Sequence, residues 1–112
     1  MNEETEPIKQ QAIKAYNTKH FEDAIQGFQT CLTYFEGIGD ELAVAEARNN
    51  LSVTRLAMKQ AQLAYDEVKG TDEVFARFGD RKRHGMAVAN TAAALEALGR
   101  KEEALALYEQ VL

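Results

Sequence analysis

The side chains best suited to bind a metal or to act as a nucleophile are His20, His84 and Cys31. They lie far apart in the chain and do not form a cluster with the short spacing of a metal site. We therefore predict no metal site. Cys31 falls where the helical pattern calls for a small buried residue, and we interpret it as a packed thiol.

Catalytic motifs are also missing from the sequence. It has no Gly-rich phosphate loop, no GxSxG and no HExxH. The acidic pairs Glu102-Glu103 and Asp72-Glu73 fall in the first turns of expected helices, where negative charge interacts favourably with the helix dipole. We interpret these carboxylates as structural, and we predict that the protein is not an enzyme and has no cofactor.

A basic run, Arg81-Lys82-Arg83 followed by His84, is the strongest local charge feature. It opens an expected helix, where each positive charge is unfavourable by about 0.3–1 kcal/mol. One hypothesis is that Arg81, Lys82 and Arg83 form a patch for an acidic partner. The alternative is a solvated turn whose arginines pair with nearby Glu or Asp.

A repeated pattern organises these residues. Ala24, Ala64 and Ala104 are separated by 40 residues each, and an apolar residue follows each of them. The same step relates three further sets: Ala12, Ser52 and Ala92; Phe28, Val68 and Tyr108; Gly39-Asp40 and Gly79-Asp80. Small residues let antiparallel helices approach closely, and apolar residues at i, i+4 and i+7 form one buried stripe. A single helix pair cannot bury that stripe, so neighbouring pairs must stack.

These residues resemble the tetratricopeptide repeat (TPR) family. The third copy carries Thr91-Ala92, Leu95, Leu98-Gly99, Ala104 and Tyr108, and the first carries Phe21, Ala24-Ile25 and Phe28. The usual period is about 34 residues; the longer period here resembles the repeats of kinesin light chains and related bacterial regulatory proteins. Arg55 stands where the second copy should have an aromatic residue. The resemblance implies an all-α chain of three stacked helix-turn-helix repeats, forming a right-handed α-solenoid with a concave groove.

We expect one domain over residues 1–112, with repeats at about 5–38, 39–78 and 79–112. Thr5 is the expected N-cap of the first helix, Gly37 and Gly39 are expected to end the second, and Asp40 is expected to cap the third. Gly70 costs about 1 kcal/mol in a helix interior, which favours a kink there. The expected helices span about 5–17, 21–36, 41–58, 61–78, 81–98 and 101–112.

Asn50 and Asn90 occupy equivalent positions in the first helices of two repeats. The resemblance implies that these helices line the groove and that asparagines in this row hold a peptide backbone, because an amide is both donor and acceptor. The alternative is that each asparagine bonds to the neighbouring helix and stiffens the stack. The predicted groove residues are Lys9, Ile13, Glu46, Asn49, Asn50, Val53, Met86, Asn90 and Ala93.

The last expected helix carries apolar residues that nothing covers: Leu105, Tyr108, Val111 and Leu112. Terminal repeats usually have a polar outer face. We therefore expect either a longer repeat array or self-association through this face.

Composition limits the remaining classes. A net charge of −5 argues against nucleic-acid binding, and a single cysteine excludes an internal disulfide. There is no signal-peptide pattern and no apolar stretch long enough for a membrane span, so we expect a cytoplasmic protein. The sequence predicts a protein–protein interaction scaffold that binds a peptide segment or partner helix. The alternative is a self-associating assembly module.

Overall fold

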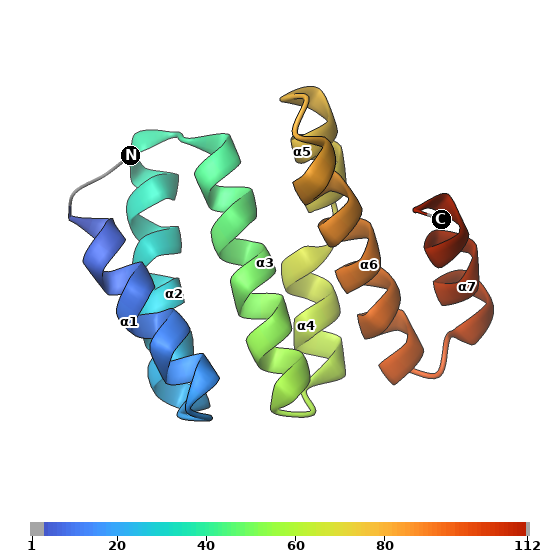
Figure 1. Ribbon diagram of the computed structural model, residues 1–112, viewed down its shortest axis with the longest axis horizontal. Helices are drawn as coiled ribbons and strands as arrows, with labels where there is room; N and C mark the ends of the chain where they lie inside the picture. Colours follow the sequence, from blue (N-terminus) through green and yellow to red (C-terminus); the bar gives the residue numbers. More distant parts are fainter. Residues whose placement is uncertain (1–3, 112) are drawn as a thin grey trace.

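The computed structural model describes residues 4–111, and this part of the chain contains helices and no strand (Figure 1). The prediction of an all-α chain is confirmed for these residues, and Leu112 lies outside them. The helices are α1 (Thr5–Asn17), α2 (Phe21–Ile38), α3 (Glu41–Ala57), α4 (Ala61–Val68), α5 (Thr71–Arg77), α6 (Arg81–Ala97) and α7 (Lys101–Gln110).

The helices pack in antiparallel pairs along the molecule: α1 with α2, α3 with α4, and α6 with α7 (Figure 1). The pairs are joined because α3 also packs on α2, and α6 packs on α4 and α5. The molecule measures 41 × 31 × 20 Å, with the pairs following one another along its longest axis (Figure 1). The first helix of each pair (α1, α3 and α6) therefore has a distinct position from the second.

The turn inside each pair has the same backbone geometry at a spacing of 40 residues. Lys19, Lys59 and Gly99 are all left-handed, with φ of 65°, 63° and 82°. The next residue donates its N–H to the carbonyl five positions earlier, the bond that closes a Schellman motif. These bonds join His20 to Ala15 (2.7 Å), Gln60 to Arg55 (2.9 Å) and Arg100 to Leu95 (2.9 Å).

The turns between pairs also repeat. Gly39 and Gly79 both have φ of 72°, and the aspartate that follows each one caps the next helix. The Asp40 carboxylate accepts from the Ala43 N–H at 3.1 Å, and Asp80 accepts from the Arg83 N–H at 3.0 Å. The predicted cap at Asp40 is therefore confirmed, and a matching cap is present at Asp80.

The first helix spans residues 5–17 as predicted, but other details of the helix ends are wrong, and α7 ends at Gln110. The second helix runs through Gly37 to Ile38, because a glycine in helical conformation costs only about 1 kcal/mol, and it ends at the C-cap residue Gly39, as predicted. Glu4, not Thr5, is the N-cap residue of α1. The helix expected over 61–78 is divided at Gly70, whose φ of 86° ends α4 and begins α5.

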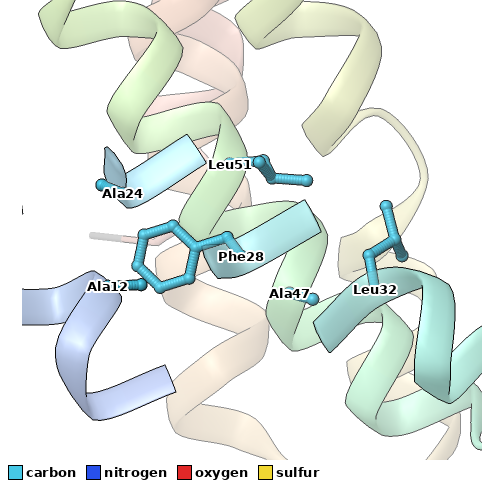
Figure 2. Close-up of a cluster of buried hydrophobic side chains, with 6 residues drawn as sticks. All are labelled: Ala12, Ala24, Phe28, Leu32, Ala47 and Leu51. Carbon is cyan, nitrogen blue, oxygen red and sulfur yellow. The ribbon is translucent and has the colours of Figure 1, made fainter. Parts of the chain in front are cut away.

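The small residues of the repeat lie in the core, as predicted. Ala24, Ala64 and Ala104 are buried, and so are Ala12, Ser52 and Ala92. Figure 2 shows the first core cluster, in which the Phe28 ring of α2 lies beside Ala12 of α1; its other members are Ala24, Leu32, Ala47 and Leu51. The small residues let the helices approach so closely that a Cβ atom on Gly27 would lie 2.8 Å from the Cβ of Ala12.

Candidate partner-binding surface

One face of the molecule is formed by α1, α3 and α6, and it carries two adjoining hollows. The first, of about 320 Å³, is bounded by α1, α2 and α3 and includes Lys9. The second, of about 400 Å³, lies between α3 and α6 and includes Asn49, Asn50 and Met86. Glu46 and Arg83 line both hollows. This face therefore brings together several of the predicted groove residues.

An ion network crosses this face at Glu46. The Glu46 carboxylate lies 3.6 Å from Lys9 Nζ of α1 and 3.0 Å from Arg83 Nη2 of α6. Arg83 also contacts Asp80 at 2.9 Å. The backbone N–H and the guanidinium of Arg83 lower the pKa of the Asp80 carboxyl. Because these groups are partly exposed, each pair contributes modestly to stability, and its main effect is to link the three helices.

The basic run divides into two parts. Arg83 pairs with Asp80 and Glu46, as the solvated-turn alternative predicts. Arg81 and Lys82 are exposed, and neither forms an ion pair with another described residue. Of the three predicted patch residues, these two therefore lack an ion pair within residues 4–111, although the charge of Lys82 helps to lower the pKa of Asp80.

Of the two asparagines at equivalent repeat positions, Asn90 forms a side-chain hydrogen bond within the molecule. Asn90 Nδ2 donates to Asn49 Oδ1 at 3.0 Å, which ties α6 to α3. Asn49 Nδ2 in turn donates to Thr71 Oγ1 at 2.9 Å and to the Ala45 carbonyl at 3.1 Å. Asn90 thus makes the contact between neighbouring helices that the structural alternative predicts, with Asn49 as its partner.

Asn50 differs from Asn90. Its side chain is half-buried in the hollow between α3 and α6, and within residues 4–111 its amide has no hydrogen-bond partner. Met86 lines the same hollow and is 54% exposed. An amide with unused donors and acceptor beside an exposed methionine is the arrangement most open to a ligand on this face.

The remaining predicted groove residues have mixed positions. Val53 and Asn90 line a third hollow of about 260 Å³, together with Tyr16 and Leu56. Ile13 packs against the first core cluster and Ala93 is half-buried, and neither lines these hollows. The predicted groove residues of α3 therefore all line a hollow, whereas Ile13 of α1 and Ala93 of α6 do not.

A larger cleft, of about 820 Å³, lies between α2 and the end of α3 with the turn into α4. The sequence did not predict this cleft. The available signal was Arg55, which stands where the repeat pattern calls for an aromatic residue. Its lining residues are Glu22, Ile25, Gln26, Gln29, Thr30, Thr33, Tyr34, Arg55, Met58 and Gln60.

The face of α7 is apolar, as predicted, but partly covered. Leu107 and Tyr108 pack against a core cluster of Ala92, Leu95 and Ala104. Leu105 is 59% exposed and Val111 is 40% exposed. The equivalent residues of the first pair, Ile25 and Cys31, are more deeply covered, because α3 follows that pair.

The residues suited to metal or nucleophilic chemistry remain apart. No group of three His, Cys, Asp or Glu side chains able to hold a metal occurs in the described part of the chain. Cys31 is buried, and burial raises the pKa of its thiol. Over the same residues, no helix combines the length and apolar character needed to cross a membrane.

Comparisons of the chain with protein families, with curated proteins and with solved structures give no match. No relative therefore assigns a role to any residue of this surface. Its function is inferred from the contacts, burial and charges described above.

Proposed function

We propose that the chain is a tetratricopeptide-like interaction module whose repeats, at about 5–38, 39–78 and 79–112, stack as a right-handed α-solenoid. The 40-residue recurrence of buried small residues supports this arrangement, and the left-handed turn residues Lys19, Lys59 and Gly99 recur at the same step. The packing of each pair on the next also supports it.

In this proposal the face of α1, α3 and α6 binds a peptide segment or partner helix, without catalysis. The observation that carries it is the free Asn50 amide beside the exposed Met86 in a hollow of about 400 Å³. The amide can pair with a peptide backbone, and the methionine side chain adapts to apolar groups of different shapes.

The proposal can be tested with random peptides displayed on phage and panned on the full chain. Enriched peptides are then synthesised and titrated by calorimetry. Asn50→Ala is expected to weaken binding about tenfold, because a backbone group of the peptide loses its partner. Asn90→Ala is expected to lower the melting temperature, because it removes the bond to Asn49.

Gln11→Ala is the matched control, because Gln11 is an exposed α1 side chain that lines none of the hollows on this face. It should change neither affinity nor stability. Failure to enrich any peptide, or an affinity that Asn50→Ala leaves unchanged for every enriched peptide, would contradict the proposed site.

A second candidate is self-association through α7, which the exposure of Leu105 and Val111 favours. Sedimentation at several concentrations tests it. A concentration-dependent dimer that Leu105→Glu converts to a monomer would support this role, and a strict monomer at high concentration would exclude it.

A further inference from the structure

Neighbouring helix pairs meet at two junctions. The space beside the second helix of a pair is filled at one junction and open at the other. Between the second and third pairs, Tyr65 of α4 packs against the cluster of Ala92, Leu95 and Ala104. The guanidinium carbon of Arg100 lies 5.3 Å from the centroid of the Tyr65 ring, which is a cation–π distance. An aromatic ring and a cation therefore occupy this junction.

Between the first and second pairs, the equivalent residues leave this space open. Ile25 stands at the position of Tyr65, and Arg55 at the position of Leu95, each 40 residues earlier. Isoleucine is smaller than tyrosine, and both Ile25 and Arg55 line the cleft of about 820 Å³. The cleft is therefore the counterpart of the space that the Tyr65 ring fills one repeat later.

Arg55 adds a specific chemistry to the cleft. Its Nη1 donates to Gln60 Oε1 at 3.1 Å, while its Nε is buried and has no partner among the described residues. An arginine offers five N–H donors in a planar fork that matches a carboxylate. The other polar lining residues are mostly neutral, and Glu22 is the only acidic one. A carboxylate entering the cleft therefore meets the charged guanidinium of Arg55, which also acts on the Glu67 carboxyl outside the lining.

We propose that this cleft is a second binding site, for a protein segment that inserts an aromatic side chain beside Ile25 and brings a carboxylate to Arg55. The aromatic side chain takes the place that Tyr65 occupies at the next junction. A volume of about 820 Å³ accommodates such a side chain together with its neighbours in the segment. The site lies on α2 and the turn into α4, so it does not depend on the Asn50 surface.

The test uses random peptides displayed on phage, depleted first on the Ile25→Tyr/Arg55→Leu variant and then panned on the wild-type chain. That variant gives the first junction the residues of the second. Retained peptides should share an aromatic residue with Asp or Glu close to it. A synthesised peptide should bind Arg55→Leu at least about tenfold more weakly than wild type, because the carboxylate loses a charged partner.

Two controls separate this site from others. Thr33 is exposed on the cleft rim, so the Thr33→Glu variant should fold normally and repel the peptide's carboxylate. If circular dichroism shows that the double variant is unfolded, Thr33→Glu replaces it in the depletion step. Replacing the peptide's carboxylate by an amide should weaken binding to wild type and have little effect on Arg55→Leu, which shows that the two groups are coupled.

Asn50→Ala should leave the affinity for these peptides within about twofold of wild type. The proposal is overturned if no peptide prefers wild type over the depleted variant, or if the retained peptides lack the aromatic and acidic residues. It is also overturned if binding survives Arg55→Leu and Thr33→Glu but is lost in Asn50→Ala, which would place the peptide on the other face.

Discussion

The two junctions between helix pairs are built from equivalent positions but packed differently. At the second junction, Leu95 is 3% exposed and Tyr65 packs against its cluster. At the first, Arg55 replaces Leu95 and Ile25 replaces Tyr65, and a cleft remains. Both junctions bury apolar side chains, such as Leu32 and Leu51 at the first, but the first also leaves a cleft lined by hydrogen-bonding groups.

This difference shows how a repeat can keep its fold while changing its surface. The backbone of the two units agrees at the turns, where Lys59 and Gly99 share a left-handed conformation. The helices also pack in the same order at both junctions. Two positions differ at the junctions: Ile25 replaces Tyr65, and Arg55 replaces Leu95. These positions do not determine the turn or the close approach of the paired helices.

The largest expected effect comes from removing the apolar side chain at the packed junction. Leu95→Ala should lower the free energy of unfolding by about 2–5 kcal/mol, because it deletes a buried side chain and leaves a cavity. Arg55→Ala, at the equivalent position of the open junction, should lower it by less than about 1 kcal/mol. Urea unfolding measures both. Equal losses would show that the junctions are packed alike.

A second comparison concerns the glycines of α2. Gly27→Ala should destabilise the protein by about 1–3 kcal/mol, because the new Cβ atom would lie 2.8 Å from that of Ala12. Gly37→Ala is the matched control, because a Cβ atom added there would have nothing within 4 Å and alanine favours a helix by up to about 1 kcal/mol. Thermal unfolding should therefore shift in opposite directions, and a stabilised Gly27→Ala variant would contradict the close approach of α1 and α2.

The turns offer a comparison of similar backbones with different residues. Gly99→Ala should cost about 1 kcal/mol, because a left-handed conformation is unfavourable for any residue with a Cβ atom. Lys59→Gly, at the equivalent turn, should stabilise the protein by up to about 1 kcal/mol for the same reason. The measurement is again urea unfolding. A shift of both variants in the same direction would indicate that the turns are not equivalent.

The smallest effect is a pH dependence at Glu67, which stands where the third pair has Leu107. Burial raises the pKa of the Glu67 carboxyl above 4.5, against the opposing effect of Arg55 and Arg48. The folded state thus binds a proton more tightly than the unfolded state does. The resulting stability is present below pH 4.5 and is lost as the pH rises through the folded-state pKa.

Glu67→Gln removes this titration. Relative to wild type, the variant should gain stability as the pH is raised from about 4 to about 7, as measured by thermal unfolding at each pH. An unchanged difference between the two proteins over that range would show that the Glu67 carboxyl is not perturbed by burial.

The sequence predicts much of the fold because the decisive signals are local. The 40-residue recurrence of Ala24, Ala64 and Ala104 identifies the paired helices, and Asp40 marks the start of α3. The break at Gly70 is predicted only as a kink. A glycine's helix cost of about 1 kcal/mol does not reveal whether the chain adopts the left-handed conformation found there.

The candidate surface is less predictable because its details depend on distances between helices. Sequence spacing places Asn49, Asn50 and Asn90 on related faces, but it cannot say which amides pair with each other. The bond from Asn90 to Asn49 requires α3 and α6 at one particular separation. The cleft likewise depends on two residues, Ile25 and Arg55, that come together only after the helix pairs have packed.

The most direct test of the central proposal is amide chemical-shift mapping by NMR with a phage-selected peptide added to the full chain. If the face of α1, α3 and α6 binds the peptide, the largest shifts should fall at Glu46, Asn50 and Met86, with little change on α7. Large shifts confined to α7, or no shifts at saturating peptide, would contradict a binding surface on this face.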